Sequence, residues 1–248
     1  MTEQLYSKYQ GRGSLQWREM MSRDIRKFNA YQQGRYELVA KYLGNLKGKT
    51  VLDLGGGDAA LAYVLYKKGA LVTIVDNEPG GIEFGKRNFD SVNARGEFVL
   101  GSAYELPFPD ESFDFVVCSE VVEHLERPEK AVEEAARVLK PGGICIVTTP
   151  HRLLEEPTDS DDLRAYFPSE MKALLSPYFT EVAVHLTHHV FWYGLYTYSA
   201  RRFSNRQFGR WFVNLLALWF HYNPFTFEYP SPAKFDRFAQ IIGVGKKR

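Results

Sequence analysis

The stretch VLDLGGGDAALA, residues Val51 to Ala62, places three consecutive glycines between an apolar run and a segment with helical spacing. An aspartate, Asp53, lies two residues before the first glycine. Glycines after a strand allow a ligand to approach the main chain, because no Cβ atom is in the way and because glycine tolerates positive φ. The stretch therefore predicts a strand, a tight turn and a helix beside a bound ligand.

Around this stretch the chain alternates short apolar runs with helical segments, a pattern typical of a parallel sheet covered on both faces. The predicted fold class is α/β with a seven-stranded, mostly parallel sheet. Strands are predicted at 50–55, 71–76, 97–102, 113–119, 144–150, 181–188 and 238–245. Helices are predicted at 58–68, after Pro79, at 128–139 and from Pro168, and two more within 17–46 precede the sheet.

No repeat, linker or low-complexity tract divides the sequence, so residues 1–248 are predicted to form one domain. Within it we expect an N-terminal helical cap at 1–48 and a ligand-binding core at 49–150. Residues 189–237, which separate the last two predicted strands and are rich in aromatic residues, are predicted to be an insertion or lid.

Charge and cysteine content narrow the class of protein. The 31 Lys and Arg residues and 30 Asp and Glu residues leave a net charge of +1, which argues against a nucleic-acid partner. Cys118 and Cys145 lie in apolar runs and are predicted to be buried thiols in a reducing compartment. Neither a signal pattern nor a membrane-spanning run is recognised, so a cytoplasmic location is expected.

Two ligand classes suit the glycine turn. The residues GGGDAA fit the dinucleotide pattern G-x-G-x-x-A, and Asp76 follows about 20 residues later, where an acid binds ribose hydroxyls. Asp53 favours a ligand with a positive centre, such as S-adenosylmethionine, which carries a sulfonium and an ammonium and has no pyrophosphate. A turn-capping role for Asp53 is the alternative, and an NAD site stays open on these residues alone.

Four blocks of sequence, in this order, resemble the class I S-adenosylmethionine-dependent methyltransferases, in particular the small-molecule branch that includes quinone-biosynthesis methyltransferases. The blocks are VLDLGGGDA (51–59), VTIVDNE (72–78), GSAYELPFPDESFDFVVCSEVVEHL (101–125) and AARVLKPGGICIVTTP (135–150). The resemblance extends from about Tyr36 to Pro150. It implies a Rossmann-like sheet and S-adenosylmethionine as the cofactor.

The resemblance also assigns site residues. Gly55, Gly56 and Gly57 would line the methionine arm of the cofactor, with Asp53 beneath it. Asp76 would accept the ribose hydroxyls, Asn77 would flank the adenine, and Ser102 and Ala103 would face the adenine edge. Family members often have an acid where this chain has Ser102, which makes the adenine contact weaker here. Ser119 and Glu120 would lie near the transferred methyl group.

Methyl transfer needs alignment, a dry site and, for a protonated nucleophile, a base. His124 is the first candidate base because it follows the fourth core strand. A structural role for His124 is the alternative, and Glu120 and Glu123 are weaker candidates. Strand alternation would place His185 and His189 on one face and His188 on the other, which is poor spacing for a metal site, so no metal is predicted.

Apolar residues of the insertion fall on one helix face: Phe208, Trp211, Phe212, Leu215, Leu216, Trp219 and Phe220. A lid that packs this face onto the sheet edge or onto itself is favoured. Alternatives are a hydrophobic acceptor pocket or a peripheral membrane surface through 189–225, with Arg201, Arg202, Arg206 and Arg210 nearby, or a homodimer interface.

Near the N-terminus, a solvated helix face is predicted for five basic residues: Arg12, Arg18, Arg23, Arg26 and Lys27. The alternative is a lid over the cofactor in which one of the arginines binds a carboxylate.

Taken together, the residues and the resemblance predict an S-adenosylmethionine-dependent methyltransferase that acts on an oxygen, nitrogen or carbon of a small molecule, with a hydrophobic or lipid-like acceptor as one option. An NAD-binding oxidoreductase and a non-catalytic cofactor-binding protein of the same fold are the alternatives.

Overall fold

The computed structural model describes residues 13–151, 162–198, 208–227 and 237–248. Arg12, Arg201, Arg202, Arg206 and most of the acidic stretch after Pro150 lie outside these ranges. The described elements are α2 (Leu15–Met21), α3 (Ala30–Leu43), β1 (Thr50–Leu54), α4 (Ala60–Lys67), β2 (Leu71–Asp76), α5 (Pro79–Ser91), β3 (Glu97–Leu100), β4 (Phe113–Ser119), η1 (Val122–His124), α6 (Pro128–Val138), β5 (Leu139–Pro150), α7 (Pro168–Leu175), β6 (Glu181–His189), α8 (Val190–Tyr198), α9 (Phe208–Trp219), η2 (Pro224–Thr226) and β7 (Phe238–Lys246).

The strands form one seven-stranded sheet in the order β3-β2-β1-β4-β5-β7-β6. The pairs from β3 to β5 are parallel, and β7 runs antiparallel to both β5 and β6. The predicted mostly parallel, seven-stranded α/β sheet is confirmed. The strand order reverses between β1 and β4, and ligands of open α/β sheets bind at the carboxyl ends of the strands beside such a reversal.

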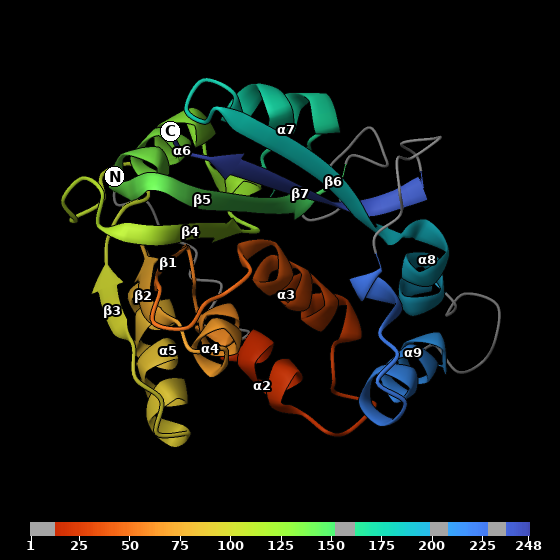
Figure 1. Ribbon diagram of the computed structural model, residues 1–248. Coiled ribbons are helices and arrows are strands. Elements are labelled where there is room, and N and C mark those ends of the chain that lie inside the picture. Colours follow the sequence, from red (N-terminus) through yellow and green to blue (C-terminus); the bar gives the residue numbers. More distant parts are fainter. Residues whose placement is uncertain (1–12, 152–161, 199–207, 228–236) are drawn as a thin grey trace, which may run out of the picture.

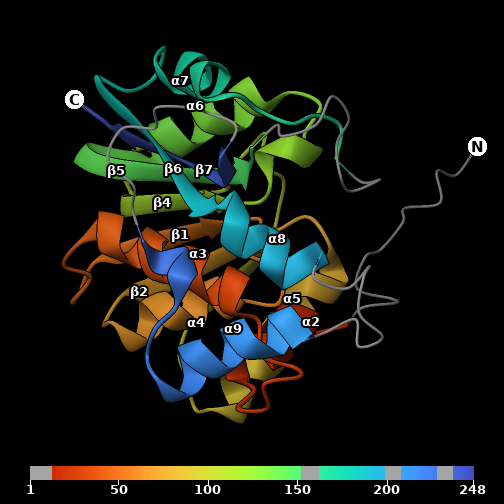
Figure 2. The ribbon, with the colours of Figure 1, turned by 90° about the vertical axis from the view of Figure 1, so that its right-hand side faces the viewer.

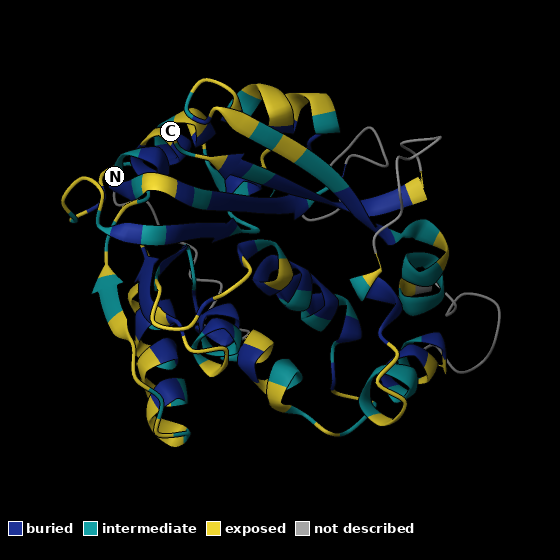
Figure 3. Ribbon diagram, viewed as in Figure 1, coloured by how far each residue is buried: buried dark blue, intermediate teal, exposed yellow. Residues whose placement is uncertain are grey.

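Helices cover both faces of the sheet (Figure 1). One apolar cluster joins the sheet to α6 and α7 and includes Val132 and Met171. A second cluster joins the opposite face to α3, α4 and α5 and includes Leu38, Leu65 and Phe89. The central strands are buried on both faces (Figure 3), which explains why their sequences are apolar throughout. The two cysteines are free and buried in this core, as predicted.

Most element boundaries follow the sequence prediction. Strands β2 and β4 have the predicted bounds. Strand β5 begins earlier than predicted, at Leu139, but its register against β4 shifts between the pairs Phe113–Leu139 and Phe115–Ile144. The regular ladder therefore starts at the predicted Ile144. The aromatic run after β6 forms helix α8, which the sequence analysis did not predict.

A third, smaller apolar cluster joins the N-terminal part of the chain to the segment between β6 and β7. Phe28 and Ala30 pack with Val213 of α9 and Phe225 of η2, and aromatic residues of α8 surround them. Helices α8 and α9 lie side by side and beside α2 (Figure 2). The division into cap, core and insertion stays a prediction, although this cluster shows that the two flanking parts pack together.

Asn214 of α9 holds these two parts together through hydrogen bonds. Its Oδ1 accepts the backbone N–H of Ala30 at 3.1 Å, and its Nδ2 donates to the carbonyl oxygens of Ile25 and Phe28. The side chain is fully buried. Loss of these bonds would leave three buried backbone groups unpaired, which is costly.

We expect Asn214→Ala to lower the free energy of unfolding by about 3 kcal/mol, because the three backbone groups lose their partner inside the protein. Urea unfolding followed by circular dichroism measures the change. Asn45→Ala is the matched control, since Asn45 is exposed and caps only a local turn. Equal midpoints for Asn214→Ala and Asn45→Ala would contradict the proposed role of Asn214.

No helix within the described ranges combines the length and the apolar character needed to cross a membrane.

Candidate active site

The glycine turn between β1 and α4 leaves no room for side chains. Gly55 adopts φ +74°, and a Cβ atom there would collide with the side chain of Val121. A Cβ atom on Gly56 would lie 2.9 Å from Oδ2 of Asp53. Both positions therefore require glycine, one for its backbone conformation and both for the close approach of neighbours.

Strand β2 holds this turn in place. The backbone N–H groups of Gly55 and Gly56 donate to the carbonyl oxygen of Val75 at 2.7 and 3.2 Å. The carboxylate of Asp76 accepts the N–H of Gly57 at one oxygen and the N–H of Glu78 at the other, both at 2.9 Å. The turn and the carboxyl end of β2 thus form one rigid unit.

Asp53 lies beneath the turn with one oxygen unused. Its residue is 2% exposed, and Oδ2 has no hydrogen-bond partner in the described structure. Burial, with smaller contributions from the carboxylates of Asp76 and Asp58, raises the pKa of Asp53 to about 7, although a backbone hydrogen bond at Ala62 lowers it. A buried carboxyl with one unpaired oxygen is costly to keep, and a cation beside it would favour its ionised form.

Asp58, which the sequence analysis did not single out, connects the turn to the N-terminal helix. Its Oδ2 accepts the backbone N–H of Trp17 in α2 at 2.9 Å, and its Oδ1 lies 3.3 Å from the N–H of Ala60 at the start of α4. The carboxylate therefore caps this end of α4. Trp17 also packs on Tyr63 of α4, with ring centroids 4.9 Å apart.

The residues predicted for the adenine side lie next to Asp76. Asn77 is exposed directly after β2, and the N–H of Gly101 donates to the carbonyl oxygen of Asp76 at 3.0 Å. Ser102 is exposed and its Oγ accepts the N–H of Tyr104, while Ala103 is partly buried. The two segments that follow β2 and β3 are thus brought together at the carboxyl edge.

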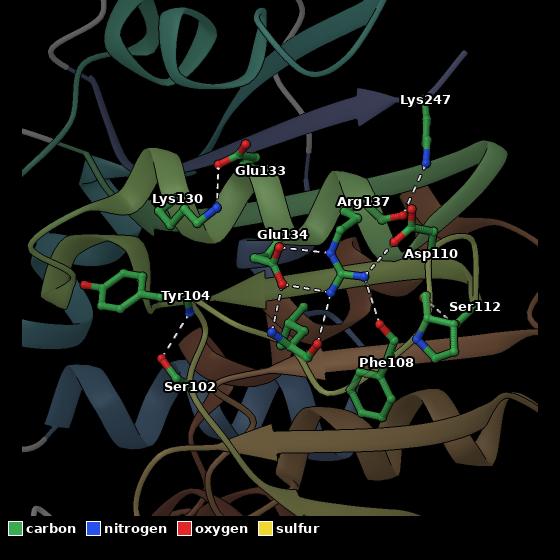
Figure 4. Close-up of polar contacts among 12 residues, drawn as sticks. Ser102, Tyr104, Phe108, Asp110, Ser112, Lys130, Glu133, Glu134, Arg137 and Lys247 are labelled. Carbon is green, nitrogen blue, oxygen red and sulfur yellow. Dashed lines mark hydrogen bonds and ion pairs between the residues drawn. The ribbon is translucent and has the colours of Figure 1, made fainter.

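Glu134 and Arg137 of α6 form a clamp that holds the loop between β3 and β4 in place (Figure 4). The guanidinium of Arg137 donates to the carbonyl oxygens of Leu106 and Phe108 and pairs with the carboxylates of Glu134 and Asp110. Glu134 also accepts the N–H of Leu106 at 2.8 Å. The hydrogen bonds from Arg137 hold the pKa of Glu134 below its usual range. None of these contacts was predicted from the sequence.

At the end of β4, Ser119 and Glu120 join a polar network. Ser119 Oγ and Thr148 Oγ1 are 2.9 Å apart. Glu120 Oε1 accepts from Thr148 and from Gln240 of β7, and Oε2 pairs with Arg35 of α3 at 2.9 Å. Because both oxygens are engaged, Glu120 is suited to positioning rather than to accepting a proton.

Helix α3 contributes to this network more than the sequence indicated. Arg35 is buried beside Glu120, and the hydroxyl of Tyr31 donates to Gln240 at 2.8 Å. Of the arginines singled out from the sequence, Arg26 pairs with Asp24 on the surface and Arg210 pairs with Glu19 of α2. Only contacts between distant parts of the chain reveal Arg35 and Gln240.

His124 ends the short helix η1 after β4. Its Nδ1 lies 3.3 Å from Oδ1 of Asp162, and its side chain is 34% exposed. Glu123, the neighbouring residue, is buried and accepts from Thr149 at 3.1 Å. Burial, and then the charge of Glu120, raises the pKa of Glu123 well above its usual range.

Glu123, His124 and Asp162 place their potential ligand atoms within 4.8 Å of one another. The sequence patterns around the two cysteines and the β6 histidines argued against metal sites and gave no indication of this group. Such a cluster is also common without a metal, and the raised pKa of Glu123 opposes metal binding because a ligand carboxyl has to be deprotonated.

The predicted alternation of the β6 histidines is wrong at His188. His188 adopts φ +62°, so the side chain leaves the regular strand pattern. Its Nε2 donates to the carbonyl oxygen of Tyr31 in α3 at 3.0 Å. Its Nδ1 lies 2.9 Å from the hydroxyl oxygen of Thr187, the preceding residue of β6. His185 stacks on Tyr42 of the same helix. Burial lowers the pKa of His188 to about 3, so it is neutral and structural.

Residues 52–147 match the profile of a methyltransferase domain family. From β1 to β5 the chain is therefore similar to methyltransferase domains. The family resemblance and the cofactor predicted from the four sequence blocks are confirmed, and no comparison supports the NAD alternative.

Two curated relatives and one solved structure illustrate the similarity. A demethylmenaquinone methyltransferase of Clavibacter sepedonicus is 40% identical over 106 residues, which are 42% of this chain and 43% of that protein. A ubiquinone biosynthesis O-methyltransferase of Alkalilimnicola ehrlichii is 34% identical over 119 residues, 48% of each chain. The chain thus spans about half the length of the curated relatives it matches. The PH0226 protein of Pyrococcus horikoshii shares the fold, with a TM-score of 0.63 and 19% identity over 98% of this chain and 100% of that one.

The clamp of the methyltransferase domain can be tested through stability. We expect Arg137→Ala to lower the free energy of unfolding by about 2 kcal/mol, because two loop carbonyls and Glu134 lose a charged donor. Thermal unfolding measures the change. Lys130→Ala is the matched control on the same helix, since Lys130 forms only an exposed pair with Glu133 and should change stability by about 0.5 kcal/mol or less. Similar losses in both variants would show that the clamp contributes no more than a surface ion pair.

Proposed function

We propose that the chain binds S-adenosylmethionine at the glycine turn and transfers its methyl group to a small, hydrophobic acceptor. The observation that carries this proposal is the unused oxygen of Asp53 beneath bare glycine backbone. A buried carboxyl with one unpaired oxygen suits a ligand that brings its own positive charge.

The chain's residues fit the cofactor in other respects. Gly55, Gly56 and Gly57 would line the methionine arm, whose ammonium would be drawn to Asp53. Asp76 already accepts two backbone N–H groups, but a carboxylate has about four acceptor positions, so the ribose hydroxyls can bind to the remaining ones. Asn77, Ser102 and Ala103 would surround the adenine, and Ser119 and Glu120 would lie on the methyl side.

The position of Asp58 opposes the NAD alternative. A dinucleotide places its pyrophosphate at the N-terminus of the helix after the glycine turn. In this chain the carboxylate of Asp58 lies at that helix end, where it is bound by Trp17. A second anion there would be repelled by Asp58 and by the acid beneath the turn.

When bound, the cofactor supplies an activated methyl group on a sulfonium, so the protein has to orient the acceptor and exclude water. For an acceptor with a hydroxyl group, we assign the role of base to His124. Asp162 would hold the Nδ1 side of the ring, and Nε2 would take the hydroxyl proton as the new bond to carbon forms. The Glu120–Arg35 pair would fix the floor on which the acceptor lies.

A hydrophobic acceptor is supported by two observations. The relatives described above are named for the biosynthesis of menaquinone and ubiquinone. The third apolar cluster, built from Phe28, Val213 and Phe225, packs against Tyr31, whose hydroxyl reaches the polar network at Gln240. A packed apolar cluster and the polar network around Glu120 are therefore adjacent.

The placement of Asp53 predicts that cofactor binding releases a proton. Free Asp53 has a pKa of about 7, so at about pH 6 it is mostly protonated, and a neighbouring ammonium favours the ionised form. Binding at about pH 6 should then release close to one proton, whereas binding at about pH 8.5 should release almost none. Calorimetry in buffers of different ionisation enthalpy measures the number of protons.

Asp53→Asn is the control for this measurement, because it keeps the shape and removes the titrating group. The variant should show no proton release at either pH. Release that persists in Asp53→Asn would assign the proton to another group and remove the support that Asp53 gives to the cofactor position.

The activity is tested by incubating the purified protein with methyl-labelled S-adenosylmethionine and a cell extract. We expect label in the organic phase, and we expect it to vanish in Asp76→Ala, whose affinity for the cofactor should fall about a hundredfold because it loses the charged acceptor for the ribose hydroxyls. Asp90→Ala, an exposed acid on α5, is the matched control and should retain full activity.

The outcomes separate the alternatives. Label confined to small aqueous products would support methyl transfer but would contradict a hydrophobic acceptor. Tight cofactor binding with no labelled product from any extract would favour a non-catalytic binding protein, and tight binding of NAD alone would favour the oxidoreductase.

A further inference from the structure

Helix α9 turns its polar side chains inward and its aromatic side chains outward. Asn214 is fully buried, and Arg210 pairs with Glu19 of α2 at 2.9 Å. In contrast, Phe208 and Trp219 are 67% and 70% exposed. The sequence favoured a lid that packs the whole apolar face inward. The structure exposes Phe208, Phe212, Trp219 and Phe220 of this face, whereas Trp211, Leu215 and Leu216 are half-buried.

The outward face is continuous along the helix. Phe208, Phe212, Leu215 and Trp219 are spaced by four, three and four residues, which places them on one side of a helix. The rings of Phe208 and Phe212 stack with their centroids 6.5 Å apart. Phe220, directly after the helix, is also exposed.

Neighbouring segments extend this face. Phe191 of α8 is exposed and contacts Trp192, which contacts Tyr222, which in turn contacts Phe227. Helices α8 and α9 lie together on one side of the molecule (Figure 2). We call this the aromatic surface, formed by Phe191, Phe208, Phe212, Trp219, Phe220 and Phe227.

The charge of this part of the chain has one sign. Between Glu181 and Glu228 the sequence contains no acidic residue, although the whole chain has 30 of them. The same stretch contains Arg210 and, outside the described residues, three further arginines. Glu19 of α2 lies against this segment, where it pairs with Arg210. A segment with four arginines and no acidic residue of its own is complementary to a negatively charged surface.

We propose that the aromatic surface binds the interface of an anionic lipid bilayer. Phe and Trp side chains are suited to the boundary between headgroups and acyl chains, and the arginines in the same stretch of sequence are attracted to anionic headgroups. The energetic reason is that exposed aromatic rings lose their contact with water on binding. This surface is separate from the cofactor site, so the proposal does not depend on methyl transfer.

The test is flotation of the full-length protein with vesicles of phosphatidylcholine, with or without about a quarter of phosphatidylglycerol. The wild type should float with the anionic vesicles, and its tryptophan fluorescence should be quenched by brominated lipid. The double variant F212Q/W219Q should bind about tenfold more weakly, because two large rings no longer enter the interface.

The double variant L71Q/L100Q is the matched control, because these leucines are as exposed but lie on β2 and β3, away from the aromatic surface. It should float like the wild type, and thermal unfolding should show that both variants fold.

Four results would overturn the proposal. The first two are that the wild type does not float with any vesicle, or that F212Q/W219Q floats as well as the wild type. The third is that the wild type binds neutral and anionic vesicles with equal affinity. The fourth is that light scattering without vesicles shows a dimer of the wild type but a monomer of F212Q/W219Q. The last result would make the surface an interface between copies of the chain. Since each readout is binding, none of these outcomes decides whether the enzyme transfers methyl groups.

Discussion

The hydrogen bond from the N–H of Gly57 to the carboxylate of Asp76 joins the two segments on which the site is built. Together with the bonds from Gly55 and Gly56 to the carbonyl of Val75, it fixes the glycine turn against the end of β2. The same carboxylate is the residue expected to hold the ribose. One side chain therefore shapes the turn and presents acceptors to the ligand, which explains why an acid at this position serves both needs.

The acceptor side of the site depends on contacts between distant elements rather than on a local motif. Glu120 is held by Arg35 of α3 and Gln240 of β7, and α3 in turn is tied to the segment between β6 and β7 through Ala30. Binding on this side thus involves the two ends of the chain. The proposed acceptor side and the glycine turn are therefore held in place by different sets of contacts.

The sequence predicted the sheet and the cofactor turn well because both are local. Each buried parallel strand is an apolar run of its own, and the glycines and acids at 53–57 and 76 lie at fixed distances along the chain. Arg35, Gln240 and Asp162 were missed because their importance arises only when segments far apart in sequence meet. His188 was misplaced because a single positive φ breaks the alternation of a strand, and nothing in the letters HLTHH signals it.

The orientation of α9 was mispredicted for an instructive reason. Hydrophobic periodicity identifies a helix and its apolar face, but it does not say that this face is the buried one. Asn214 satisfies three backbone groups from the inner side of the helix, and leaving such groups unpaired would be costly. Val213 packs on the same inner side. Both residues therefore favour the orientation in which Phe208, Phe212 and Trp219 are exposed, where a further apolar phase can cover them.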